Sequence, residues 1–205
     1  MNFFNPDNSL WRFLGKLADL FLLSGCWLLC SLPLVTVGSA SIALYDAVSH
    51  GLRHDEGGIY RRFFRTFRSE LKRGIALTLL WTAIGLLLSF GYQILYQFGG
   101  ADSVFATFTV VYYFLLAIPV ALVCWIVALE SRYVYSIAEL HRIATILTFG
   151  KLPTSLAVVA MLLVGFELCV QLPFLLMVVP ASLCYFQTWF VERIFAKLTP
   201  AETEE

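Results

Sequence analysis

A carboxylate inside a long apolar run is the side chain of this sequence best placed to do chemistry. Glu167 lies in the run from Thr154 to Leu172, and Gln171 follows one helical turn later on the same face. A charge near a bilayer centre costs about 2.5 to 3.5 kcal/mol on insertion scales, so we expect Glu167 to face protein. With Gln93 from another run, these residues form a candidate intramembrane polar site for a proton or a solute. The alternative is a structural carboxylate that its neighbours satisfy.

Histidines and cysteines form no comparable site. His50 and His54 are four residues apart beside two carboxylates, but Gly51 between them weakens the helix that would align them. All five cysteines lie in apolar runs, where a free cysteine packs as a small hydrophobic residue. The sequence has no glycine-rich phosphate loop, nucleophile elbow or metalloprotease helix. We therefore expect no metal, no cofactor and no enzyme activity.

The composition that surrounds these residues is typical of an integral membrane protein. Hydrophobic residues make up 60% of the 205 residues and charged residues only 14%, with a mean hydropathy of +0.80. That is too little polar surface to cover a soluble core of this size. The net charge of zero gives no sign of a nucleic-acid partner, because only the placement of the charges is informative.

Five apolar runs predict an all-α, polytopic transmembrane bundle. A helix needs roughly 20 mostly apolar residues to cross the hydrocarbon, and the candidate spans are 17–37, 74–98, 104–129, 154–172 and 174–194. A turn near Pro173 separates the last two, since proline favours a break before it. We expect one membrane domain over 1–198 and a mobile acidic tail over 199–205.

The end of the first run carries a predicted break at Pro33, Thr36 and Gly38. Proline removes a backbone donor, a nearby hydroxyl can satisfy a freed carbonyl, and glycine permits close helix approach. Asp19 near the start makes this run less clean than the others. The run either spans the membrane and continues as a cytoplasmic helix, or enters and turns back.

The polar segment that follows contains a strongly amphipathic helix, predicted over Ile59 to Arg73. One face is apolar and the other is a basic stripe of Arg61, Arg65, Arg68 and Lys72. Such a helix can lie flat on the membrane with its cations towards anionic lipid head groups, or it can pack its apolar face on the other helices. Both can hold together. A second amphipathic helix is expected within 131–149.

The basic residues also predict the orientation of the chain. Twelve of the 14 Lys and Arg residues lie in the segments 38–73, 132–151 and 193–197. These segments share one side of a five-span protein, so we expect segment 38–73 and the C terminus to be cytoplasmic. Arg12 and Lys16 are the exceptions. The N terminus is outside if the first run spans the membrane. Because Arg12 and Lys16 are basic, a re-entrant first run with a cytoplasmic N terminus remains the alternative.

Three short motifs resemble the YesL family of bacterial membrane proteins, a domain of unknown function. They are Leu32-Pro33-Leu34-Val35-Thr36-Val37-Gly38, then Ala43-Leu44-Tyr45, then Phe63-Phe64-Arg65-Thr66-Phe67-Arg68 leading to Leu71-Lys72-Arg73. The similarity covers nearly the whole chain and departs at Glu70, where an Asn is expected. Members are often found beside genes for carbohydrate uptake, so the resemblance implies a role accessory to sugar transport. It implies no catalytic residues.

Two hypotheses for function follow. The first is a protein of the bacterial cytoplasmic membrane that assists or regulates carbohydrate uptake, with the bilayer, anionic lipid head groups and sugar importer subunits as partners. The alternative is a small transporter or channel with Glu167 on the solute or proton path. Association with a second copy of the chain is compatible with either hypothesis.

Overall fold

The computed structural model describes residues 9–52, 58–98, 103–133 and 135–198, and every regular element within them is helical. The α-helices are α1 (Ser9–Ser31), α2 (Val37–Asp46), α3 (Ile59–Ser69), α4 (Leu71–Phe98), α5 (Ser103–Glu130), α6 (Ile137–Gly150), α7 (Leu152–Gln171) and α8 (Val179–Leu198). Shorter turns are the 3-10 turns Leu34–Thr36 and Pro173–Met177 and the π turn Ala47–Leu52. The predicted all-α class is confirmed.

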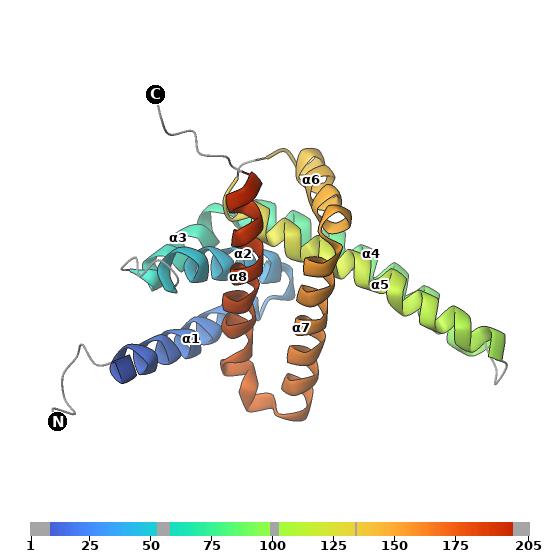
Figure 1. The fold of residues 1–205 in the computed structure, drawn as a ribbon, viewed down its shortest axis with the longest axis horizontal. Helices are drawn as coiled ribbons and strands as arrows, with labels where there is room; N and C mark the ends of the chain where they lie inside the picture. Colours follow the sequence, from blue (N-terminus) through green and yellow to red (C-terminus); the bar gives the residue numbers. More distant parts are fainter. Residues whose placement is uncertain (1–8, 53–57, 99–102, 134, 199–205) are drawn as a thin grey trace.

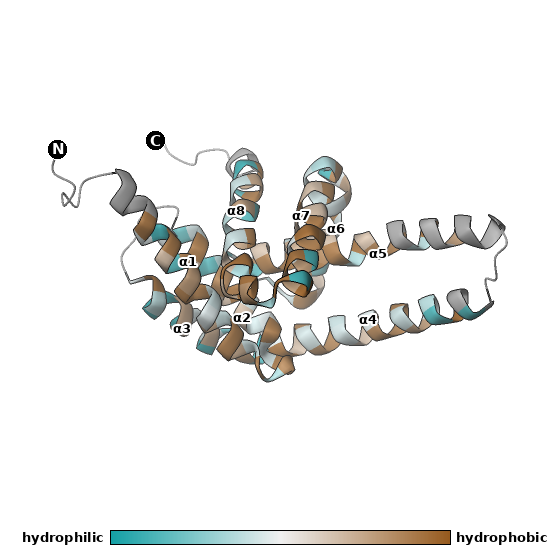
Figure 2. Ribbon diagram, turned by 90° about the horizontal axis from the view of Figure 1, so that it is seen from below, coloured by the Kyte–Doolittle hydropathy of each residue, from teal (hydrophilic) through white to brown (hydrophobic). Residues whose placement is uncertain are grey.

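The helices are arranged around α2. This short helix packs against α1, α3, α4, α5 and α8. Helices α4 and α5 run side by side and project from the body as a long hairpin, while α7 and α8 form a second hairpin across α2 (Figure 1). The view from below shows the same projection of α4 and α5 (Figure 2). The chain is therefore a central helix with hairpins attached to it.

Helix α2 and the π turn after it are the most completely buried part of the chain. Buried residues in this segment are Ser39, Ala40, Ile42, Ala43, Leu44, Tyr45, Asp46, Ala47, Val48 and Ser49. Both hydrophobic clusters of the core include residues from it. The sequence analysis placed this stretch in a polar segment and expected close helix approach at Gly38, but it did not predict how completely the stretch is buried. Its many small side chains allow five helices to approach it at once.

Helices α2 and α4 cross with their backbones in close contact. A Cβ atom added to Gly38 would lie 2.7 Å from the carbonyl oxygen of Gly74, and one added to Gly74 would lie 2.6 Å from the backbone nitrogen of Ser39. The Gly38 N–H donates to Thr78 Oγ1 at 2.9 Å, and that hydroxyl donates to the Gly74 carbonyl at 2.7 Å. Glycine is required on both helices because there is no room for a side chain.

The first predicted run is divided at Pro33. Helix α1 ends at Ser31, because proline lacks an N–H and disfavours helical geometry in the residue before it. Thr36 Oγ1 then donates to the carbonyls of Cys30, at 2.6 Å, and Pro33, at 2.7 Å. The predicted break is present, and a single helix over 17–37 does not form.

Other element boundaries also differ from the expected ones. The amphipathic helix predicted over 59–73 is two helices, because α3 ends at Ser69 and α4 begins at Leu71. The run 174–194 begins with a 3-10 turn, and its helix starts only at Val179. Helix α6 is separated from α5 and begins with a capping box, in which Ser136 and Glu139 satisfy each other's backbone N–H groups.

Three helices are long and apolar enough to cross a membrane. The apolar segments are Leu14–Ser31 in α1, Leu71–Ile94 in α4 and Leu152–Gln171 in α7, and α5 has a shorter one over Leu115–Glu130. These four are the apolar segments of the described residues, so the structure supports a membrane protein without establishing five spans. Residues 199–205, predicted to be a mobile tail, lie outside the described residues.

We expect Gly74→Ala to destabilise the protein, because its methyl group would meet the Ser39 backbone. Overpacking of this kind typically lowers the free energy of unfolding by about 1 to 3 kcal/mol. Gly85→Ala is the matched control, since a Cβ atom there meets nothing within 4 Å. Thermal unfolding of both variants in mild detergent would measure the difference. Equal melting temperatures would contradict the close crossing of α2 and α4.

Candidate functional site

The polar residues predicted inside the membrane are only partly brought together. Gln171 Nε2 donates to Glu167 Oε1 at 2.9 Å, and both side chains are exposed on α7. Gln93 lies on α4, whose far end projects away from α7 (Figure 1). The expectation that Glu167 faces the interior of the helix bundle is not met in this chain. The Glu167 carboxylate accepts its hydrogen bond from Gln171, one helical turn away on the same exposed face of α7.

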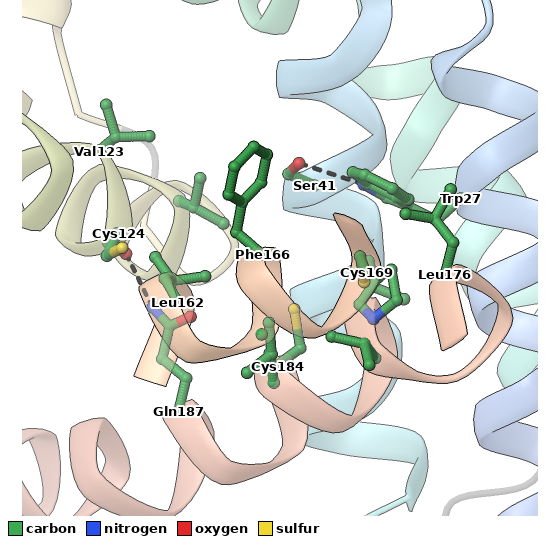
Figure 3. Close-up of a pocket in the computed structure, with 16 residues that line it drawn as sticks. Trp27, Ser41, Val123, Cys124, Leu162, Phe166, Cys169, Leu176, Cys184 and Gln187 are labelled. Carbon is green, nitrogen blue, oxygen red and sulfur yellow. Dashed lines mark hydrogen bonds between the residues drawn. The ribbon is translucent and has the colours of Figure 1, made fainter. Parts of the chain in front are cut away.

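A central apolar cavity of about 310 Å³ lies where five helices meet. Trp27, Ser41, Val123, Phe166 and Gln187 are among its lining residues, and they come from α1, α2, α5, α7 and α8 (Figure 3). Its few polar groups are engaged: Trp27 Nε1 donates to Ser41 Oγ at 3.2 Å, and Gln187 Nε2 donates to the Cys124 carbonyl at 3.2 Å. The cavity therefore presents carbon and sulfur atoms.

Three of the five cysteines line this cavity, which the sequence analysis did not foresee. Cys124 comes from α5, Cys169 from α7 and Cys184 from α8, and all are free thiols. No group of three His, Cys, Asp or Glu side chains suitable for a metal ion occurs among the described residues. Cys124, Cys169 and Cys184 follow no regular spacing in the sequence, so no sequence pattern predicts that they line the same cavity.

Two further apolar cavities adjoin the central one. A cavity of about 280 Å³ lies between α2, α4 and α5, and one of about 340 Å³ lies between α4, α5 and α7. Val123 lines all three cavities, and Trp81 lines the last two. Glu167 lines none of these three. These three cavities are thus suited to apolar ligands and are separate from Glu167.

The basic stripe lies on the outside of the molecule. Its four members, Arg61, Arg65, Arg68 and Lys72, are all exposed. On the other side of α3, Phe63 is fully buried against α2. Hydrophilic residues accordingly gather on α3 (Figure 2). The apolar face of the helix packs on other helices, as one of the two predicted arrangements requires, and the cations remain available to a partner.

A buried carboxylate beneath this helix was missed by the sequence analysis. Asp46 is 5% exposed, and Arg62 Nε donates to both of its carboxylate oxygens at 3.1 Å. Thr66 Oγ1 donates to Oδ2 at 2.6 Å, and His50 Nδ1 lies 3.0 Å from Oδ1. This Asp46 cluster fixes α3 to the end of α2. The sequence did contain one indication of this contact. Arg62 is not part of the basic stripe and lies one helical turn before Thr66, so the two side chains can reach the same partner.

A second contact fixes α3 to α1. Tyr60 Oη donates to Asp19 Oδ1 at 2.7 Å. Burial of the phenol raises the pKa of Tyr60, and its hydrogen bond to the Asp19 carboxylate raises the pKa further. Asp19, the charged residue near the start of the first apolar run, therefore has a hydrogen-bond partner on the amphipathic helix α3.

We expect Asp46→Ala to lower the free energy of unfolding by about 3 kcal/mol, because it leaves Arg62 without its carboxylate. This is the lower end of the usual range, since the Arg62 side chain is 26% exposed. The double variant Asp46→Leu with Arg62→Met should recover part of the loss, as neither charge then remains. Arg61→Met, on the exposed face, is the control. Chemical denaturation in detergent would measure all three, and an unchanged midpoint for Asp46→Ala would refute the role of the cluster.

Ion pairs join the ends of α4, α5 and α8 at one end of the molecule. Arg73 of α4 pairs with Glu130 at the end of α5 and also donates to the Tyr135 carbonyl. Arg132, just after α5, pairs with Glu192 of α8. We call these four ion-paired residues the charged end. The side chain of Glu130 is only 1% exposed, so its carboxylate depends on Arg73 for compensation.

Burial dominates the electrostatics of Glu130. It raises the pKa of this carboxyl from 4.5 to about 7, against the opposing effect of Arg73 and with a further rise from Glu70. The Arg73 guanidinium favours the charged form of Glu130 and lowers its pKa, whereas burial favours the protonated form and raises its pKa. Burial has the larger effect, because a nearly inaccessible carboxylate loses most of its hydration.

The shifted pKa predicts a pH dependence of stability. The folded state holds the Glu130 proton more tightly than the unfolded state, so the stabilisation is full below pH 4.5 and is lost as the pH rises through about 7. The total difference is on the order of 3 kcal/mol. Melting temperatures at pH 5 and pH 8 should therefore differ more for the native protein than for Glu130→Gln. The same pH dependence in both would contradict the assignment.

The fold and the site define a class of protein: an all-α chain with apolar helices able to cross a membrane, and with its described cavities apolar. Residues 20–92 match the model of a family described as "Protein of unknown function, DUF624". This segment runs from α1 into α4 and includes α2, the Asp46 cluster and the basic stripe. No curated protein and no solved structure matches the chain.

Proposed function

We propose that this chain is a multi-pass protein of the bacterial cytoplasmic membrane, with about five spans in a single membrane domain. Helices α1, α4 and α7 have the length and composition of spans. Helices α5 and α8 form hairpins with α4 and α7, so each accompanies a candidate span along its length. Membership of the YesL family, on the motifs quoted above, is part of this proposal.

The orientation that we propose has the charged end and the basic stripe in the cytoplasm. Arg73, Arg132 and Glu192 meet at one end, and the basic stripe adjoins it where α3 meets α4. Cytoplasmic segments of membrane proteins carry an excess of Lys and Arg. This orientation places the C-terminal end of α8 on the same side.

We further propose that the protein assists or regulates a carbohydrate uptake system through the basic stripe. One observation carries the docking role: four cations are exposed on a face whose opposite side is buried, and among the described residues none of the four pairs with a carboxylate. Exposed cations of this kind fit an acidic surface of a cytoplasmic importer subunit. The carbohydrate part rests on the family resemblance alone.

The transporter alternative has less support. It needs a polar path to Glu167, yet this side chain is exposed on α7 and lines none of the three cavities described above. These cavities are lined mainly by apolar side chains. Trp27 and Gln187 in the central cavity donate hydrogen bonds within the chain, and the buried Trp81 Nε1 beside the other two has no hydrogen-bond partner among the described residues.

An in-cell crosslinking experiment tests the proposed docking. A photoreactive residue at Arg65 should capture an importer subunit in cells grown on the transported sugar. Reversing Arg61, Arg65 and Arg68 to Glu should abolish capture by a probe at Lys72 and lower sugar uptake, because opposite charges across the interface become like charges. Mass spectrometry of the crosslinked product and radiolabelled uptake would measure the two effects.

The control is charge reversal at Arg142 and Lys151, which are exposed on other elements. This variant should keep both capture and uptake. Capture of no importer subunit, together with unchanged uptake in a deletion strain, would rule out the accessory role. Thiol labelling of a cysteine at Arg65 only from outside intact cells would rule out the orientation.

A further inference from the structure

Besides carbon and sulfur atoms, the central cavity presents one amide oxygen. Gln187 of α8 lines this cavity and is only 7% exposed. Its Nε2 donates to the Cys124 carbonyl at 3.2 Å, and no hydrogen bond from the described residues reaches its Oε1. Figure 3 shows the amide nitrogen turned towards Cys124 and the oxygen turned towards the other lining side chains. The oxygen is therefore an unused acceptor in the wall of an apolar cavity.

The orientation of the Gln187 amide follows from its partner. A backbone carbonyl only accepts hydrogen bonds, so the atom that faces the Cys124 carbonyl must be the nitrogen. Turning the amide over would bring two acceptors together. The oxygen therefore stays on the cavity side, where leaving it without a donor costs free energy. A ligand that brings a donor removes this cost.

The lining of the cavity excludes a charged ligand. None of the described residues that line it carries a charge, and burial of a charge without a countercharge is very costly. A single unused acceptor fits a ligand with a single donor. An alcohol brings one hydroxyl on a hydrocarbon body, whereas a sugar brings many polar groups that this lining cannot satisfy. A water molecule needs about two to four polar partners, which the apolar wall does not supply.

The cavity has room for the hydrocarbon part of such a ligand. Gln187 and Cys124 lie on one side of it, and Trp27 lies on the opposite side (Figure 3). Along α8 the wall extends from Val179 to Gln187, which is about 12 Å at 1.5 Å per residue. Its volume of about 310 Å³ is at the lower end of the range for ligand sites, about 300 to 1,000 Å³. Thiols and aromatic rings in the wall make favourable dispersion contacts with hydrocarbon.

We propose that the central cavity binds an uncharged, membrane-soluble alcohol, whose hydroxyl donates to Gln187 Oε1 and whose hydrocarbon part lies along α8 towards Val179. This binding site goes beyond the proposed docking of an importer subunit and uses none of the residues of the basic stripe. Variants inside the cavity leave the basic stripe unchanged, so failure of either proposal is recognised separately.

Photolabelling of the full chain in mild detergent tests the site, with a diazirine derivative of octanol as the probe. Peptide mass spectrometry should find the label on the segments of α5, α7 and α8 that line the cavity. Cys169→Phe fills the cavity, and we expect it to lose this label. Val170→Phe is the matched control, because Val170 is the next residue of α7, is exposed and lines none of the three cavities. It should keep the label.

Competition against the probe tests the hydroxyl. Octanol should displace the label better than octyl methyl ether, which has no donor. Gln187→Leu should lower the ratio of the two potencies by about fivefold, the factor that corresponds to one hydrogen bond of about 1 kcal/mol. Gln171→Leu, at an exposed glutamine of α7, should leave the ratio unchanged. Partition of each competitor into detergent is the same for every variant and cancels in this comparison.

Size-exclusion profiles and circular dichroism establish that each variant folds. Leu176→Trp, elsewhere in the cavity wall, replaces Cys169→Phe if that variant does not fold, and Gln187→Met replaces Gln187→Leu. Equal labelling of the cavity-filled variant and Val170→Phe would overturn the site. An unchanged preference for octanol after removal of the Gln187 amide would overturn the choice of an alcohol.

Discussion

Gly38 and Gly74 let α2 and α4 cross with their backbones closer than any side chain would allow. The contact is held by Thr78, which accepts from the Gly38 N–H and donates to the Gly74 carbonyl. Because this crossing fixes α2 against a long apolar helix, the other helices have a defined surface on which to pack. Among the described residues, α2 is the most completely buried helix that contributes to both hydrophobic clusters.

Burial of α2 brings a carboxylate with it, and the structure compensates that charge. Asp46 accepts from Arg62 and Thr66, so the amphipathic helix α3 is fixed to α2 by charge as well as by Phe63. Removing one partner of such a pair is more destabilising than never having had the pair. Both the Asp46 cluster and the charged end therefore determine how helices are arranged, more than they add to net stability.

The apolar hollows follow from the same arrangement. Two hairpins diverge from α2, and helices that diverge cannot fill the space between them with their own side chains (Figure 1). In water such a surface would be a liability. In a bilayer the solvent is itself hydrocarbon, so exposed leucines and phenylalanines on α4 and α7 are in their proper environment.

The sequence by itself determined the helical class, the break at Pro33 and the basic stripe, because these depend on local rules: run length, missing donors and helical periodicity. It did not predict that Glu167 is exposed on α7, or that α2 is the most completely buried helix of the described residues. Both are questions of which face meets which neighbour, and apolarity in a membrane segment does not distinguish lipid from protein. Only the tertiary structure decided that small residues place α2 at the centre, that Asp46 meets Arg62, and that three distant cysteines line one cavity. These contacts join residues far apart in the chain, and no short-range pattern encodes them.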